Sequence, residues 1–305
     1  MDHLRQNNEA AFQPDLALSL QTERVCHTGR ADTSAAKGQA HKPRATERHL
    51  DQFYTCERVA ASLYQVFCRN LDPSRFQFVE PSAGKGAFFK LLPPGSIAYD
   101  IDPKGPGIIK ADFLKIQLPT TSRIAVIGNP PFGKNSSMAV RFFNHAAPQV
   151  EVIAFILPRT FQKNSILKRL DPFFHLLHEE VVQGKAFWFE GRRKSVPTVF
   201  QIWEKRLELR EQQPMPIEHD DFDFTEPHLA HFAIQRVGQR AGEVQTAFKA
   251  ESKSHYFIKP NVEGLEKVFS SLNLGEVAKR TAGMPSLAKS ELVALYTAHK
   301  RYHGV

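Results

Sequence analysis

Residues 76–88 read FQFVEPSAGKGAF, a short apolar run that ends in the acidic Glu80 and then turns through Gly84 and Gly86. The apolar run predicts a buried strand, and the residues after the glycines predict a helix. Because glycine has no Cβ, this turn lets the backbone approach a ligand closely, beside the positive end of the helix. A dinucleotide-binding loop of the G-x-G-x-x-G type would have a small residue where this chain has Phe89, so the pattern disfavours pyrophosphate binding.

The rest of the central region repeats this alternation of short apolar runs and longer spacers. The spacers leave room for crossover helices, so the pattern predicts an α/β fold with a doubly wound, mostly parallel sheet and helices on both faces. The further apolar runs are SIAYDID at 96–102, RIAVIGNPP at 123–131, VEVIAFILP at 150–158, FHLLHEEVV at 174–182 and VPTVFQIWEK at 196–205.

Composition changes mark the domain boundaries. The polar residues 1–45 predict a disordered N-terminal arm, and apolar residues at helical spacing from Val59 to Phe67 predict a helix inside a domain of residues 46–206. A dense run of charge and proline predicts a linker at 207–230, followed by a small C-terminal module at 231–305. The basic residues of this module either contact backbone phosphates or only solvate its helices.

The bulk properties restrict the class of protein. A net charge of +8 and a pI near 9.4 favour a polyanionic partner such as nucleic acid, although they also serve solubility. The sequence has neither a long apolar run nor a signal peptide, so we expect a soluble, cytoplasmic protein without a membrane. The three cysteines lack zinc spacing, so we expect no metal.

Two acidic positions follow strand patterns and suit a nucleoside ligand. Asp100 stands at the carboxyl end of a predicted strand, where open α/β sheets bind ligands, and is placed to accept hydrogen bonds from ribose hydroxyls. Asp112 and Phe113 pair a carboxylate with a ring, which suits the amino group and the face of an adenine. Taken alone, this second pair favours a purely structural role.

The sequence Asn129-Pro130-Pro131-Phe132 directly follows a predicted buried strand. Two successive prolines stiffen the turn and leave carbonyl groups free to accept hydrogen bonds. The Asn129 Oδ1 atom and the Pro130 carbonyl can accept from the two N–H groups of a base amine, and Phe132 offers a ring on which the base can stack. The turn therefore predicts a catalytic site that orients an exocyclic amine.

These motifs occur in a fixed order along the chain, from QFYT at 52–55 through EPSAGKG at 80–86 to NPPF at 129–132. In this order they resemble the S-adenosylmethionine-dependent amino-group methyltransferases, especially the N6-adenine methyltransferases of nucleic acid, whose pattern is QFYTP, EPSAGxGxF, an acidic strand end, D-F and [DNS]-PP-[YF]. The resemblance covers roughly residues 50–205. It implies a Rossmann-like methyltransferase sheet, S-adenosyl-L-methionine as cofactor, and direct transfer without a metal or a covalent enzyme intermediate.

The resemblance also assigns roles to residues. It implies that Tyr54 and Thr55 contact the methionine end of the cofactor, that Asp100 holds the ribose, and that Asp112 and Phe113 hold the adenine. The loop beneath the cofactor is implied at Glu80, Pro81, Ala83, Gly84 and Gly86, and the catalytic turn at Asn129, Pro130, Pro131 and Phe132. Two positions depart from the pattern, since Cys56 replaces a common proline and Phe132 a more frequent tyrosine.

The stretch KAFWFEGRRK at 185–194 mixes aromatic rings with cations. Such a loop can stack on an extruded base and contact phosphates, and we therefore predict a substrate-binding segment. A hydrophobic hairpin with a solvated tip fits the same pattern. The residues predicted to contact the substrate are Lys185, Phe187, Trp188, Arg192, Arg193 and Lys194.

The sequence leaves several functions open. DNA is our preferred substrate because the motif order, with QFYT in front, most resembles the DNA enzymes. Methyltransferases that act on adenines in ribosomal or messenger RNA have the same turn. Enzymes with a related turn methylate a glutamine amide of a protein. A nucleic-acid-binding module with a vestigial cofactor site is the alternative outside the enzymes.

Overall fold

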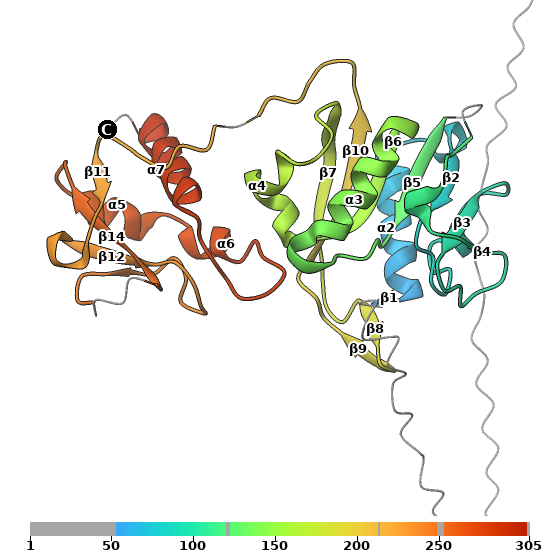
Figure 1. Cartoon of the computed structure of the whole chain (residues 1–305), viewed down its shortest axis with the longest axis horizontal. Coiled ribbons are helices and arrows are strands. Elements are labelled where there is room, and N and C mark those ends of the chain that lie inside the picture. The colour runs from blue at the N-terminus through green and yellow to red at the C-terminus, as the bar shows by residue number, and fades with distance from the viewer. Residues whose placement is uncertain (1–52, 120–122, 213, 249–252, 304–305) are drawn as a thin grey trace, which may run out of the picture. The chain divides into compact units, whose positions relative to one another are not determined.

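The structure is a computed structural model that describes residues 53–119, 123–212, 214–248 and 253–303 (Figure 1). The predicted disordered arm of residues 1–45 lies outside the described residues. The described chain forms a large central sheet, a small three-stranded sheet beside it, and a separate four-stranded sheet in the C-terminal part.

The central sheet has seven strands in the order β4-β3-β2-β5-β6-β10-β7. The first five strands in this order run parallel, and β10 runs antiparallel to both of its neighbours, which confirms the predicted mostly parallel sheet. The strands are β2 (Gln77–Glu80), β3 (Ile97–Asp100), β4 (Ile109–Lys110), β5 (Ile124–Gly128), β6 (Val152–Pro158), β7 (Phe174–Val182) and β10 (Thr198–Lys205).

Helices cover both faces of this sheet because alternate strand residues point to opposite faces. Helix α2 (Glu57–Asn70) packs through Leu63 and Phe67 on Phe78, in one hydrophobic cluster. Helix α3 (Ser137–Ala146) packs in the other cluster, where Phe143 meets Trp203 edge to face. The short helix α4 (Asn164–Leu167) adds Ile166 to this second cluster.

The segment after the glycine turn differs from the prediction. Instead of an α-helix it forms turns and the 3-10 helix η2 (Phe89–Leu91), and Pro93 and Pro94 follow at once. Proline disfavours helical backbone in the preceding residue and lacks the N–H that a helix needs, so a longer helix cannot form here. The positive helix end that the sequence indicates beside the turn is therefore missing.

A small antiparallel sheet joins two distant parts of the chain. Strand β1 (Tyr54–Thr55) pairs with β8 (Phe187–Phe189), which forms a hairpin with β9 (Arg192–Lys194). Because β7 runs parallel to β6, the connection from β7 to β10 that carries this hairpin leaves the central sheet at the carboxyl ends of its parallel strands. The stretch 185–194 thus lies at the edge where such sheets bind ligands.

The C-terminal part has its own sheet and its own core. The sheet order is β11-β14-β12-β13, all antiparallel, and Phe222, Phe232 and Phe269 lie in its buried cluster. Since β11 falls within the predicted linker of 207–230, this module begins earlier than the sequence indicates. Its elements are β11 (Phe222–Phe224), β12 (Phe232–Gln235), β13 (Val244–Gln245), β14 (His255–Pro260), α5 (Leu265–Ser271), α6 (Leu274–Ala278) and α7 (Lys289–His303).

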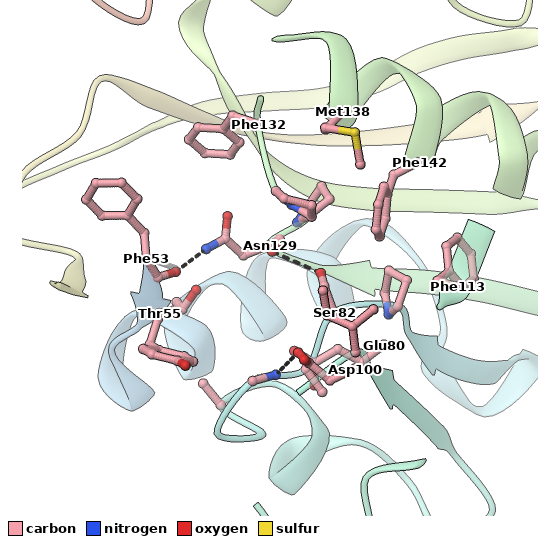
Figure 2. Close-up of a pocket in the computed structure, with 18 of the residues that line it drawn as sticks. Phe53, Thr55, Glu80, Ser82, Asp100, Phe113, Asn129, Phe132, Met138 and Phe142 are labelled. Atoms are coloured by element: carbon pink, nitrogen blue, oxygen red, sulfur yellow. Dashed lines mark hydrogen bonds between the residues drawn. The ribbon is translucent and has the colours of Figure 1, made fainter. Parts of the chain in front are cut away.

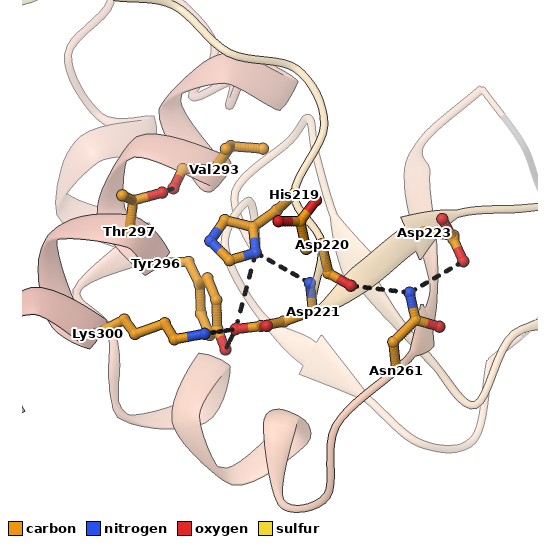
Figure 3. Close-up of polar contacts among 9 residues, drawn as sticks. All are labelled: His219, Asp220, Asp221, Asp223, Asn261, Val293, Tyr296, Thr297 and Lys300. Carbon is orange, nitrogen blue, oxygen red and sulfur yellow. Dashed lines mark hydrogen bonds and ion pairs between the residues drawn. The ribbon is translucent and has the colours of Figure 1, made fainter. Parts of the chain in front are cut away.

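A buried carboxylate fastens helix α7 to the start of β11 (Figure 3). The Asp221 carboxylate accepts hydrogen bonds from Tyr296 Oη and Lys300 Nζ, each at 2.6 Å. The bonds from Lys300 and then Tyr296 lower the pKa of Asp221 below its ordinary value. Charge-assisted hydrogen bonds of this kind are short and strong, so this carboxylate stabilises the module.

We predict that Asp221→Asn lowers the free energy of unfolding at pH 7 by about 1–3 kcal/mol, as expected for hydrogen bonds to a charged group. The folded-state pKa of Asp221 is lowered, so its contribution is fully present above the unfolded value of about 3.9 and is lost as the pH falls through the folded pKa. The difference from the unsubstituted protein should therefore shrink below a pH of about 4 in urea unfolding followed across pH.

Asp220→Asn provides the matched control, because Asp220 is the exposed neighbour of Asp221. If both variants have the same stability and the same dependence on pH, Asp221 does not fasten α7 to β11.

Candidate active site

A cavity of about 370 Å³ opens at the carboxyl ends of β2, β3 and β5, with β1 on one side. The chain passes from β2 to β3 and β4 on one side and later to β5 and β6 on the other, so the cavity lies where the strand order reverses. Thirteen of the predicted catalytic and cofactor residues line it, namely Tyr54, Thr55, Glu80, Pro81, Ala83, Gly84, Asp100, Asp112, Phe113, Asn129, Pro130, Pro131 and Phe132.

Asn129 is held in one orientation at this cavity (Figure 2). Its Nδ2 atom donates to the Phe53 carbonyl at 2.8 Å, and its own carbonyl accepts from Ser82 Oγ at 3.0 Å. A carbonyl can accept only from the amide nitrogen, so this bond decides which side of the Asn129 amide is the oxygen. The Oδ1 atom is buried and has no hydrogen-bond partner among the described residues. The cavity therefore contains a fixed acceptor that a ligand donor can satisfy.

Asp100 supports the glycine turn directly. One carboxylate oxygen accepts from the Gly84 backbone N–H at 2.7 Å, and the other accepts from the Asp102 backbone N–H at 2.7 Å. Each carboxylate oxygen has further lone-pair capacity, so Asp100 can still accept hydrogen bonds from a ligand. The sequence predicts the ligand role of this residue but not its bond to the turn.

Gly84 is required for the shape of the turn. Its φ is +54°, and a Cβ built on it would lie 2.7 Å from the Tyr54 ring. The ring of Tyr54 thus packs directly on the backbone of the turn, and Lys85 Nζ lies 5.1 Å from its centroid. Gly86, also predicted as a cofactor residue, adopts a φ of +75° but is not among the cavity-lining residues.

Glu80 is buried at the floor of the cavity. Burial raises the pKa of Glu80 well above its ordinary value, and the Asp100 carboxylate adds to this rise. The Phe89 backbone N–H donates to Glu80 Oε2 at 2.8 Å, and this bond opposes the rise in the pKa. Glu80 therefore ties the end of β2 to η2 and shapes the turn from beneath.

Asp112 and Phe113 both line the cavity, and Figure 2 shows Phe113 at the side away from Phe53. The Asp112 carboxylate accepts from the Leu114 backbone N–H at 3.1 Å and lies 3.6 Å from Lys115 Nζ. The Phe113 ring is buried and stacks on Phe142 with centroids 5.5 Å apart. The pair thus has the structural role that the sequence left open, and it also borders the cavity.

Sequence reasoning missed seven residues of the cavity wall, namely Phe53, Ser82, Ala87, Ile101, Gly133, Met138 and Phe142. Phe53 is the aromatic residue of the QFYT motif, so the motif itself marks it. Ser82 belongs to EPSAG in the same way. Met138 and Phe142 come from α3, and nothing in their local sequence distinguishes them from core residues.

The hairpin residues divide into two groups. Phe187 is fully buried and meets Phe53 edge to face, so it belongs to the core and offers no face to a base, contrary to the prediction. Trp188 is exposed, and the Arg193 guanidinium lies 5.9 Å from its ring centroid. The other predicted contacts, Lys185, Arg192 and Lys194, are exposed as well, and in the described part of the chain none of these cations has a carboxylate partner.

Two further contacts join the hairpin to the segment that starts at Phe53, beside the β1–β8 pairing. The Phe189 ring stacks on Phe53 with centroids 4.6 Å apart. The backbone N–H of Cys56 donates to the Ala186 carbonyl at 3.0 Å, a bond that the proline common at this position could not form. The departure at Cys56 therefore strengthens the link between the two segments.

Comparison with known proteins gives fold-level likenesses only. No family model matches the chain, and neither does any curated protein. An RNA methyltransferase candidate from Pyrococcus horikoshii is 18% identical with a TM-score of 0.42, over 54% of this chain and 91% of that one. The 23S rRNA methyltransferase ErmE is 19% identical with a TM-score of 0.36, over 52% and 72%. A type I restriction-modification methyltransferase subunit from Streptococcus thermophilus is 18% identical with a TM-score of 0.37, over 52% and 47%.

Two further features concern metals and membranes. The described residues contain no group of three or more His, Cys, Asp or Glu side chains arranged to hold a metal ion. Among the described helices none is both long and apolar enough to cross a bilayer.

We predict that Gly84→Ala weakens binding of S-adenosylmethionine at least tenfold, because the new methyl group displaces the Tyr54 ring and disturbs the turn. Gly95→Ala is the matched control, since Gly95 also has a positive φ of +86° but its Cβ would meet nothing within 4 Å. Calorimetric titration of both variants checks this. Equal cofactor affinity in the two variants would show that the packing of Tyr54 on the turn does not shape the site.

Proposed function

We propose that this protein transfers a methyl group from S-adenosylmethionine to an exocyclic amino group of a nucleic-acid base, namely the N6 amine of adenine in DNA. The observation that carries this proposal is the buried Asn129 Oδ1 atom, an acceptor without a partner among the described residues, fixed by the bond from Nδ2 to Phe53. A buried acceptor of this kind costs free energy unless a ligand donor completes it. An amine N–H is such a donor.

The turn around Asn129 suits an amine better than a hydroxyl. Pro130 and Asn129 both line the cavity, and the Pro130 carbonyl would be the second acceptor beside Asn129 Oδ1. Two acceptors bind both N–H bonds of an amine, which turns its lone pair away from them. The lone pair would then face the cavity that Gly84 and Asp100 also line.

The residues present fit the proposed cofactor. A volume of about 370 Å³ is within the usual range for small-molecule sites. Asp100 retains acceptor capacity for ribose hydroxyls, and the Tyr54 ring that packs on Gly84 also lines the cavity. Asp112 and Phe113 would hold the adenine. When bound, S-adenosylmethionine supplies an electrophilic methyl group on a sulfonium.

The contribution of the protein to transfer is orientation. Accepting the methyl group from the sulfonium, which would become a neutral thioether, would place a positive charge on the amine nitrogen. Asn129 Oδ1 and the Pro130 carbonyl stabilise this charge through the N–H bonds that they accept, so they bind the transition state more strongly than the neutral amine. The amide oxygens are weak bases, so the proton finally leaves to water.

Aromatic rings surround the position proposed for the base. Figure 2 shows Phe53 and Phe132 at the end of the cavity where Asn129 lies. Both rings are partly buried and pack against the same core cluster, so each is held in place. A base removed from its stack would find faces to stack on here, which duplex substrates require before their amine is accessible.

The exposed hairpin residues support a nucleic-acid substrate. Lys185, Arg192, Arg193 and Lys194 are exposed on the segment that pairs with β1, next to the cavity. Cations of this kind bind phosphates without regard to sequence. A protein glutamine amide would satisfy the same acceptors of Asn129, but it would make no use of this basic segment.

We predict that the full chain transfers labelled methyl groups from S-adenosylmethionine to duplex DNA, with N6-methyladenine identified by mass spectrometry of the nucleosides. Asn129→Ala should lower kcat roughly a hundredfold or more, because it removes the orienting acceptor. Asn70→Ala is the matched control, since Asn70 is exposed and its Nδ2 bonds to the Val66 carbonyl of its own helix.

Single-stranded DNA and RNA are tested in parallel. Label in RNA alone would overturn the DNA assignment and leave the reaction intact. If the cofactor binds but neither nucleic acid is labelled, the substrate class is wrong, and a protein amide or a vestigial site takes its place.

We further predict that replacing Arg192, Arg193 and Lys194 together by Gln raises KM severalfold and leaves kcat within about twofold, as expected for contacts made equally in the ground and transition states. The dependence of KM on salt should also weaken, because fewer counterions are released on binding. Steady-state kinetics across salt concentrations measures both effects. Arg206→Gln is the control, since Arg206 follows the far end of β10 and lies 3.8 Å from Glu204. An unchanged salt dependence in the triple variant would exclude the hairpin as a phosphate contact.

A further inference from the structure

The C-terminal module contains a second cavity, which we call the module groove, of about 550 Å³. Its lining includes the aromatic residues Phe224, Tyr256 and Phe257 and the cations Arg236 and Lys289. All of these lie within the module, and none takes part in the site described above. The Phe224 and Tyr256 rings meet edge to face with centroids 5.5 Å apart, so they form one continuous aromatic surface.

Each cation of the groove rests on one of these rings. Arg236 Cζ lies 5.5 Å from the Tyr256 centroid, and Lys289 Nζ lies 4.4 Å from the Phe224 centroid. The Tyr256 hydroxyl donates to the Leu287 carbonyl at 3.1 Å, which fixes its ring. Cation–π contacts hold the two charges in place without neutralising them.

Three other cations of the module are neutralised by carboxylates. Lys300 bonds to Asp221, and further pairs join Arg240 to Glu243 and Lys279 to Glu276. In contrast, neither Arg236 nor Lys289 forms an ion pair within the described part of the chain. One groove of the module therefore contains two cations that form no ion pair with a described carboxylate.

The Arg236 guanidinium also has an unused donor. Its Nη1 atom donates to the Lys253 carbonyl at 3.4 Å, a long bond, while its Nε atom is buried and bonds to no described residue. A buried N–H without an acceptor is costly, and an anion entering the groove would supply one. Glu226 is the one carboxylate among the groove-lining residues, and it opposes such an anion.

We infer that the module groove binds a backbone phosphate of nucleic acid. A guanidinium and an ammonium that line one groove suit the several oxygens of a phosphate, and each already rests on a ring that a base would otherwise use for stacking. The identity of the anion as nucleic acid rests on the proposed function. Because phosphate contacts carry no sequence information, the groove adds affinity and sets orientation without reading the target sequence.

The test measures binding of a fluorescent DNA duplex to the full chain by anisotropy at several salt concentrations. We expect the double variant Arg236→Gln with Lys289→Gln to bind about tenfold more weakly near physiological salt, and the slope of log affinity against log salt to fall in magnitude by about one to two units. Lys267→Gln, an exposed lysine on α5 outside the groove, is the control for loss of charge.

A second variant separates binding from folding. Glu226→Gln removes the exposed carboxylate of the groove without touching the cation–π pairs, so it should strengthen binding severalfold, which a merely structural role of Arg236 and Lys289 would not produce. If the double variant binds with the affinity and salt slope of Lys267→Gln, or if Glu226→Gln leaves binding unchanged, the inference is overturned.

The outcome is separable from that of the methylation assay. Methyl transfer to DNA together with unchanged binding by the groove variants overturns only the inference about the module groove. Binding that depends on the groove, without methyl transfer to any nucleic acid, overturns only the proposed reaction.

Discussion

The Asn129 amide donates its Nδ2 hydrogen to the Phe53 carbonyl, and the arrangement of the site depends on this bond. It joins the turn after β5 to the segment that enters β1, across 76 residues of sequence. It also fixes the direction of the amide, so that Oδ1 stays buried without a partner among the described residues. A single hydrogen bond thus brings two predicted motifs together and leaves the acceptor on which the proposed chemistry rests.

The position of the bond follows from the sheet. Strand β5 lies next to β2 at the point where the strand order reverses, so the turns after both strands open onto one cavity. The antiparallel β10 has a second effect, because the connection from β7 must return at the same edge and there forms the β8–β9 hairpin. The exposed cations of the hairpin therefore stand beside the cavity as a consequence of strand direction.

The central domain and the C-terminal module hold their basic residues in different environments. In the central domain the basic residues of the hairpin are exposed and solvated, and their proposed role depends on closeness to the cavity. In the C-terminal module Arg236 and Lys289 are held over aromatic rings, while several neighbouring cations are paired with carboxylates. Fixed cations of this kind suit a ligand that passes over the surface, as a nucleic-acid backbone does.

The sequence by itself determined the features that depend only on residues close together in the chain. Apolar runs gave the strands, and the motifs placed Asp100 and Asn129 correctly at the cavity, because hydrophobic alternation and turn chemistry act over a few residues. Only the tertiary structure decided which distant segments meet. In the fold Phe187 is buried against Phe53, and Arg236 rests on the ring of Tyr256. A 3-10 helix stands where the sequence predicts an α-helix after the glycine turn, and β11 lies inside the predicted linker. Contacts of this kind depend on strand direction and packing across the fold, and no local pattern records them.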